Sequence, residues 1–277
     1  MTTTATPIYD PTVALPDNDL PLRKSRLLAA ARSGRPAATL KLNFADPRVV
    51  EIAALARPDA IWLCNEHVPN DWLNLENQIR AARIYGIDTI VRVEKGSYSD
   101  LIKPFEAGAS GIMVPHVTHA GEARKLVSRL RFQPLGSRPL DGGGIDGAFC
   151  QLPLHDYLRH ANQEQFVIFQ IESPEAVAHV EAIAAVPGFD ILLFGAGDFA
   201  HLIGHPGEQE HPEVIAARQR IGAAARQHGK FAMLAGIPAS LESLRAEGYS
   251  IFNTGADVIG LATYFKASVG KVPFLFS

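Results

Sequence analysis

IWLCNEHVPNDWLNLENQIRAARIYG, residues 61–86, contains the unit from which the fold can be predicted. It opens with a short apolar run typical of a buried strand, and this run stops at two titratable side chains, Glu66 and His67. A helical pattern follows, with apolar residues three and four positions apart, and the segment ends in a glycine, a common helix stop. The segment therefore predicts a strand, a polar loop and a helix, in that order.

The same order repeats along the chain. The short apolar runs that predict strands are AATLKL, AIWLC, TIVRV, GIMVP, FVIFQI, ILLFG, FAMLA and IFNTG. Longer helical patterns lie between them, including residues 119–131, 173–188 and 211–229, and another pattern, residues 21–34, precedes the first run. Eight strands alternating with helices predict a closed (β/α)8 TIM barrel with an extra N-terminal helix. The main rival is an open doubly wound sheet, which lacks support because no GxGxxG turn follows the first run.

Composition sets the domain organisation and narrows the class of partner. The chain has 277 residues, of which 47% are hydrophobic and 20% charged, so it can bury one large core. We expect residues 1–20, rich in Thr, Pro and Asp, to form an N-terminal arm, and residues 21–277 to form a single barrel domain. A formal net charge of -3 gives no electrostatic footprint for nucleic acid or an anionic membrane, so small-molecule partners are expected.

The cysteines and the N-terminus predict a cellular location. Cys64 and Cys150 are too few for a disulfide framework and form no CxxC pattern, so both are expected to be reduced thiols. The N-terminus lacks a basic region followed by an apolar one, and no apolar window of about 18 residues follows it. We therefore expect a cytoplasmic protein that neither is secreted nor spans a membrane.

Charged side chains follow or end several predicted strands. Glu66 and His67 follow the second run, Arg92 ends the third, Glu172 follows FVIFQI, and Asp198 follows ILLFGAG. In a barrel these strand ends share one rim, where active sites lie. Each residue alone has a simpler interpretation: His67 or Arg92 in an ordinary hydrogen bond or ion pair, and Asp198 as a helix N-cap. Their convergence on one rim favours a catalytic site.

The residue types at this rim suit enolate chemistry. Glu172 and Asp198 offer oxygen ligands suited to Mg²⁺ or Mn²⁺, with positions left for water and substrate. Arg92 is a fixed cation that can stabilise an oxyanion, and His67 can move a proton near neutral pH. The GAGD segment also places small residues at a helix start, where backbone N–H groups can receive a substrate carboxylate.

Several blocks of the sequence resemble a known family. NEHVPND, IVRV, GIMVPHV, FQIESPEAV, LFGAGDFAHLIG and GADVIGLA are similar, in this order, to blocks of the HpcH/HpaI aldolase family, the class II hydroxy-oxoacid aldolases that act on pyruvate. The resemblance extends from about residue 40 to about residue 269. It implies a (β/α)8 barrel, usually hexameric, with the last helix exchanged between subunits. It also implies a divalent metal, held by a Glu and an Asp, that chelates pyruvate through its carboxylate and keto oxygens.

Carried over residue by residue, the resemblance assigns the substrate side of the site. Glu172 and Asp198 become the metal ligands, for Mg²⁺ or Mn²⁺ with Co²⁺ or Zn²⁺ as alternatives. Gln170 lies beside the bound pyruvate, and the backbone of Gly197 and Asp198 holds its carboxylate.

The resemblance also assigns the proton-transfer side, where the sequence departs from the family. Arg92 becomes the stabiliser of the enolate and aldol oxygens, His67 the base, and Glu106 the acid that orients this histidine. Cys64 stands where the family usually has the Asp of its D-x-E-H block, so the roles of Cys64 and Glu66 stay open.

Two further departures concern loops. The GAGDFA segment replaces the more usual G-P-x-D-L-S, and the loop GSRPLDGGGIDGAFC, residues 136–150, is longer than the common loop after the fourth helix. We expect the longer loop to alter which second substrate fits.

The sequence thus predicts a metal-dependent aldolase or lyase. It would cleave a hydroxy-oxoacid reversibly to pyruvate and an aldehyde through a metal-bound enolate, as a homo-oligomer such as a hexamer. Two alternatives stay open: another pyruvate-superfamily C–C lyase or decarboxylase, and a catalytically impaired barrel that acts as a binding or assembly subunit, for which Cys64 is the clue.

Overall fold

The computed structural model describes residues 22–271 and contains a closed barrel of eight parallel strands. Each strand pairs with the next in chain order, and β8 pairs with β1 to close the barrel. The strands are β1 Ala37–Leu42, β2 Ala60–Cys64, β3 Asp88–Arg92, β4 Gly111–Val114, β5 Phe166–Ile171, β6 Ile191–Phe194, β7 Phe231–Ala235 and β8 Tyr249–Ala256. All eight predicted strands are confirmed, and with them the (β/α)8 barrel. The predicted arm, residues 1–20, lies outside the described residues.

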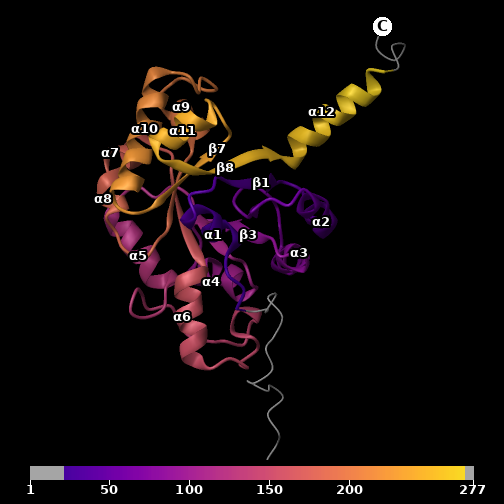
Figure 1. Cartoon of the computed structure of the whole chain (residues 1–277), viewed down its shortest axis with the longest axis vertical. Coiled ribbons are helices and arrows are strands. Elements are labelled where there is room, and N and C mark those ends of the chain that lie inside the picture. Colours follow the sequence, from indigo (N-terminus) through magenta and orange to yellow (C-terminus); the bar gives the residue numbers. More distant parts are fainter. Residues whose placement is uncertain (1–21, 272–277) are drawn as a thin grey trace, which may run out of the picture.

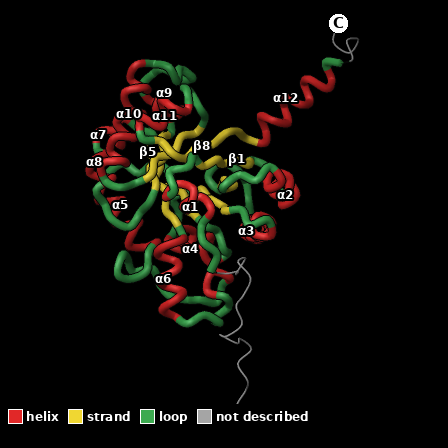
Figure 2. The backbone as a smooth tube through the Cα atoms, in the orientation of Figure 1, coloured by secondary structure: helices red, strands yellow, loops and turns green. Residues whose placement is uncertain are grey.

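Helices other than α12 surround the barrel, as Figure 2 shows. They are α1 Arg26–Arg32, α2 Pro47–Leu55, α3 Trp72–Ile84, α4 Tyr98–Glu106, α5 Ala120–Leu130, the 3₁₀ turn η1 Ile145–Gly147, α6 Leu154–Glu164, α7 Pro174–Ala178, α8 Val180–Ala184, α9 Ala196–Leu202, α10 Pro212–Gln227, α11 Leu241–Glu247 and α12 Asp257–Val269. The pattern at residues 173–188, predicted as one helix, is split between α7 and α8, because the backbone of His179 leaves helical geometry (φ -106, ψ 10).

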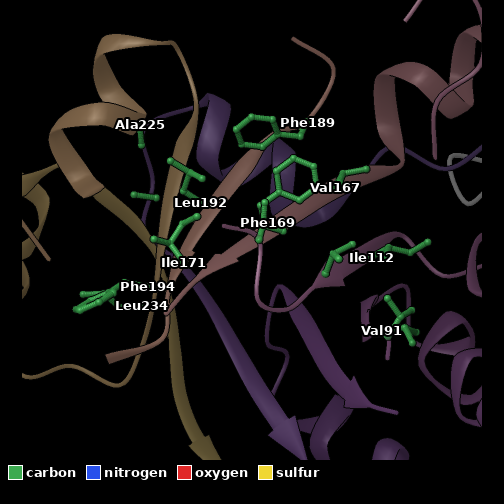
Figure 3. Packing of buried hydrophobic residues seen from close by; sticks show 14 of the residues in the cluster. Val91, Ile112, Val167, Phe169, Ile171, Phe189, Leu192, Phe194, Ala225 and Leu234 are labelled. Atoms are coloured by element: carbon green, nitrogen blue, oxygen red, sulfur yellow. The ribbon is translucent and has the colours of Figure 1, made fainter. Parts of the chain in front are cut away.

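The strands are continuous apolar runs because both of their faces are buried. Side chains alternate between the two faces of a strand, so one set points outward beneath the helices and the other points into the barrel. Outward-facing residues include Val91, Ile112, Val167, Phe169, Leu192 and Leu234, which belong to one cluster with helix residues such as Ala225 (Figure 3). Inward-facing residues include Trp62, Ile90, Met113, Ile168, Leu193, Met233 and Ile251. The hydrophobic core therefore consists of two clusters, one between the strands and the surrounding helices and one inside the barrel.

The extra N-terminal helix α1 lies at the amino-terminal ends of the strands. Asp88, the buried first residue of β3, accepts hydrogen bonds from the Ser25 hydroxyl (2.7 Å) and the Leu27 backbone N–H (2.9 Å). Arg23 forms an ion pair with the same carboxylate (2.7 Å). The amino-terminal end of the barrel is thus occupied by structural contacts, which leaves the carboxyl ends of the strands for a site.

Helix α12 extends away from the barrel instead of packing on it (Figure 1). None of its residues is buried, and several large apolar side chains are exposed, among them Ile259 (66%), Tyr264 (66%) and Phe265 (57%). Among the helices of residues 22–271, none is both long enough and apolar enough to cross a membrane.

Candidate active site

Strand alternation brings the predicted site residues to the carboxyl ends of the strands. Cys64 and Arg92, the last residues of β2 and β3, lie two positions after the inward-facing Trp62 and Ile90, so they also face inward. Gln170, two positions after Ile168 on β5, is buried on the same side. The strand tips therefore form a polar layer above an apolar barrel interior.

Glu172 is the buried carboxylate at the tip of β5, with 1% of its surface exposed. Its Oε1 accepts a hydrogen bond from the backbone N–H of His116 (2.8 Å), and the Gln170 amide donates to its Oε2. Burial raises the pKa of Glu172, and the nearby carboxylate of Asp198 raises it further, although the contacts from His116 oppose this. A Cβ atom on Gly195 would lie 2.8 Å from Oε2, so only glycine lets this carboxylate sit against the end of β6.

Asp198 and Gly197 lie in the first turn of α9 and are exposed to solvent. The carboxylate of Asp198 contributes to the raised pKa of Glu172. Gly195 occupies the N-cap of this helix, so capping does not explain Asp198. A Cβ atom added at Gly197 would meet nothing within 4 Å, which shows that the backbone here faces open space. The two predicted metal ligands therefore follow adjacent strands, β5 and β6, and one is buried while the other is accessible.

Arg92 is buried (4% exposed) at the tip of β3, where it pairs in register with Cys64 at the tip of β2. Its Nε lies 2.9 Å from Oε2 of Glu66, and its Nη2 donates to the Cys64 sulfur (3.1 Å). The guanidinium also lies 5.0 Å from the ring centroid of Trp62. Glu66, whose role the sequence left open, is thus the counter-ion of Arg92.

His67 lies at the rim, with 61% of its side chain exposed. Its Nε2 is 3.6 Å from Oε2 of Glu66, and its backbone N–H donates to the Cys64 sulfur (3.4 Å). The imidazole is therefore accessible to a substrate and lies beside the carboxylate that pairs with Arg92.

His116 belongs to this site although sequence reasoning assigned it no role. Its Nδ1 lies 2.8 Å from Oε1 of Glu172, and its Nε2 lies 3.1 Å from Oε1 of Glu66, so one ring joins the two carboxylates. Its backbone is left-handed (φ 53), an uncommon conformation for a residue with a side chain. Its position directly after the strand GIMVP is the signal that was missed, because the other site residues also sit at or just after strand ends.

Glu106 lies at the other end of the barrel. It is the last residue of α4, and helices of such a barrel run antiparallel to the strands, so its carboxylate lies near their amino-terminal ends. There it is 3.9 Å from Nη2 of Arg138, and burial raises its pKa. Within one described chain, Glu106 does not contact His67. The same geometry applies to the loop at residues 136–150, which follows α5 and packs near Glu106, so within one subunit it does not border the site.

The residues at the tips of β5 and β6 fit a divalent cation with an incomplete protein shell. Within residues 22–271, no three His, Cys, Asp or Glu side chains gather as a metal cluster. Two carboxylates with room for water suit Mg²⁺ or Mn²⁺, which keep several waters and bind substrate oxygens. The buried Oε1 of Gln170 also lacks a hydrogen-bond donor among the described residues. The donors are therefore hard oxygens that leave coordination positions open.

Comparisons with known proteins agree with this architecture. The family model for HpcH/HpaI aldolase/citrate lyase matches residues 39–263. A hydroxypyruvate/pyruvate aldolase from Pseudomonas aeruginosa is 35% identical over 199 residues, covering 72% of this chain and 73% of the relative. A 2-keto-3-deoxy-L-rhamnonate aldolase from Klebsiella pneumoniae is 31% identical over 221 residues, 79% and 82% of the two chains.

Solved structures show the same likeness. An HpcH/HpaI aldolase/citrate lyase family protein from Burkholderia cenocepacia superposes with a TM-score of 0.81 at 31% identity, covering 90% of this chain and 99% of the other. The citrate synthase SbnG gives a TM-score of 0.80 at 29% identity, with coverage of 88% and 96%. Because the family model matches most of its length and relatives more than 30% identical cover more than two thirds of it, the chain belongs to the HpcH/HpaI aldolase/citrate lyase family of carbon–carbon lyases.

Proposed function

We propose that this member of the family is a class II aldolase that reversibly cleaves a hydroxy-oxoacid to pyruvate and an aldehyde. The observation that supports this most strongly is the arrangement of the strand tips: Glu172 and Asp198 lie on the β5 and β6 side, and Arg92 with Glu66 lies on the β2 and β3 side. Relatives named pyruvate aldolases and keto-deoxy-sugar aldolases support the substrate class.

Glu172 and Asp198 would hold the divalent cation, Mg²⁺ or Mn²⁺, with Co²⁺ or Zn²⁺ as substitutes. When bound, such a cation supplies Lewis-acid chemistry that acidifies the protons next to the keto group. Gln170 lies beside Glu172 and would contact the oxoacid, while the exposed backbone of Gly197 and Asp198 would receive its carboxylate.

The residues on the other side move the proton and stabilise charge. In cleavage, His67 takes the proton of the substrate hydroxyl, the carbon–carbon bond breaks, and its electron pair passes to the oxoacid half as an enolate. Arg92 stabilises the enolate oxygen, and the proton returns to carbon to give the methyl group of pyruvate. Glu66 pairs with Arg92 and lies beside His67, which orients both groups.

The assembly is part of the proposal. We expect a cytoplasmic homo-oligomer, a hexamer, in which α12 packs on a neighbouring subunit. Because Glu106 lies at the far end of its own barrel, it can orient His67 only from another subunit.

Exchange of the pyruvate methyl protons in D₂O, followed by ¹H NMR with added Mg²⁺ or Mn²⁺, tests the proposal. We expect Glu172→Gln and Asp198→Asn each to weaken Mn²⁺ binding measured by EPR and to slow exchange, because each removes a charge that holds the cation. Glu213→Gln is a matched control, since Glu213 occupies the first turn of α10 as Asp198 does in α9.

Chelator should silence the wild-type enzyme reversibly. Full activity after rigorous chelation would rule out the metal mechanism. No exchange with any of the four metals would favour the impaired barrel that acts as a binding or assembly subunit.

A further inference from the structure

His116 is a rim residue to which the proposed reaction gives no task. It follows β4, and its imidazole lies between two carboxylates: Nδ1 is 2.8 Å from Oε1 of Glu172, and Nε2 is 3.1 Å from Oε1 of Glu66. The side chain is 55% exposed, so packing alone does not hold it in this orientation. Its backbone is left-handed (φ 53), a conformation that a residue with a side chain keeps only where surrounding contacts fix it.

Hydrogen bonds on both sides fix the backbone of His116. Its N–H donates to Oε1 of Glu172 (2.8 Å), and its carbonyl accepts a hydrogen bond from the ammonium of Lys95. Lys95 is itself held by an ion pair with Glu122 (2.5 Å). A fixed segment of backbone therefore presents the imidazole to Glu172, which is the support that a ligand-binding side chain requires.

The two ring nitrogens of His116 have different partners. Glu66 pairs with Arg92 through Oε2 (2.9 Å), and its Oε1 accepts the Nε2–H of His116. This hydrogen bond leaves the lone pair of Nδ1 directed toward Glu172. An imidazole that donates from one nitrogen to a carboxylate and binds a cation through the other is the usual arrangement of metal-ligating histidines.

The spacing of the two facing atoms suits a shared cation. Two ligands held at right angles, each ~2.1 Å from an octahedral ion, are about 3 Å apart. Nδ1 of His116 and Oε1 of Glu172 are 2.8 Å apart, and the backbone N–H of His116 takes only one of the two lone pairs of Oε1. Since no third His, Cys, Asp or Glu side chain of residues 22–271 joins such a group, this pair is the preformed part of the site, and the exposed Asp198 is free to turn toward it.

We propose that His116 is a third protein ligand of the divalent cation, which it binds through Nδ1 beside Glu172 and Asp198. This inference rests on the proposed function, because it takes the cation to lie at these two carboxylates. Imidazole nitrogen suits Co²⁺ and Zn²⁺, whereas Mg²⁺ and Mn²⁺ prefer oxygen ligands. His116 thus shifts the metal preference of this chain toward Co²⁺ and Zn²⁺.

Pulsed EPR of the Mn²⁺-loaded protein tests the inference without relying on turnover. A nitrogen bound to Mn²⁺ modulates the electron spin echo at ¹⁴N frequencies, and we expect this modulation in the wild type. His116→Gly removes the imidazole, and glycine adopts the left-handed backbone freely, so the fold should survive and the modulation should disappear. His116→Asn, which also tolerates this backbone, should give the same result.

Titration calorimetry with Co²⁺ and Mn²⁺ gives a second readout. We expect His116→Gly to weaken Co²⁺ binding by about tenfold or more and Mn²⁺ binding by less, because the lost ligand is a nitrogen. Circular dichroism should show that the variant keeps the signature of the barrel.

Two other histidines provide matched controls. His67 is the other rim imidazole, 3.6 Å from Glu66, and His119 lies three positions after His116, where its Nδ1 caps α5. His67→Asn and His119→Asn should both retain the ¹⁴N modulation and the wild-type ratio of Co²⁺ to Mn²⁺ affinity. Glu172→Gln should lose the modulation, because it removes the carboxylate that shares the cation.

The outcomes separate the inference from the proposed function. A ¹⁴N modulation that survives His116→Gly or Glu172→Gln, or tighter Mn²⁺ binding in His116→Gly, would overturn the inference. If wild-type pyruvate exchanges its methyl protons but the modulation is absent, the inference fails and the proposed function stands. If the modulation depends on His116 but no exchange occurs with any of the four metals, the inference stands and the proposed function fails.

Discussion

Arg92 makes several contacts at once that a lysine side chain cannot reproduce. Its guanidinium pairs with Glu66, donates to Cys64 and lies over Trp62. The ammonium of a lysine has neither the planar fork nor the stacking face, so it cannot keep all three contacts. We expect Arg92→Lys to slow turnover by about 100-fold while the fold survives, a loss typical of removing one oxyanion donor. Steady-state kinetics with circular dichroism would check this, and unchanged turnover would make Arg92 a structural residue.

Cys64 is the second residue whose chemistry invites a test. Cys64, which stands where the resemblance implies an acid, is a buried thiol that accepts hydrogen bonds from Arg92 and from the His67 backbone. A carboxylate would accept the same hydrogen bonds more strongly. We therefore expect Cys64→Asp to leave Mn²⁺ binding intact and to raise the rate of methyl-proton exchange, and His67→Asn nearly to abolish exchange.

The two variants have different contrary outcomes. A lower rate of methyl-proton exchange in Cys64→Asp would mean that the active site of this protein requires the thiol at this position. Wild-type exchange in His67→Asn would place the base elsewhere and leave Glu66 and His67 as structural neighbours.

Among the elements, α12 has the least support from its own barrel. Its exposed residues include Val258, Ile259, Leu261, Tyr264, Phe265 and Val269, and contiguous apolar surface of this kind marks an interface. We expect light scattering at micromolar concentration to show an oligomer. A monomer would contradict the expectation.

A truncation ending at Asp257 provides the control for this element. Asp257 should be kept, because its carboxylate accepts hydrogen bonds from the backbone N–H groups of Asn43 (2.9 Å) and Phe44 (2.9 Å) at the end of β1. If α12 forms the interface, the truncated chain should dissociate while its circular dichroism retains the signature of the barrel.

For the whole molecule, closure of the barrel is what turns separate strand ends into a site. Arg92 and Glu172 are 80 positions apart in the sequence and meet through Glu66 and His116, with contacts of 2.8 to 3.1 Å. The same closure puts Glu106 and the loop at residues 136–150 on the opposite end, because each helix returns the chain to the amino-terminal side.

Residue patterns were enough to predict the eight strands, the barrel class and the rim on which Glu172, Asp198, Arg92 and His67 lie. These predictions follow from local rules. Apolar runs indicate strands that are buried on both faces, and polar residues at the ends of the runs indicate where the burial stops. The pairing of the charges became known from the folded chain. The fold placed His116 between two carboxylates and separated Glu106 from His67. Such pairings depend on distances between residues remote in the chain, which neither periodicity nor spacing encodes.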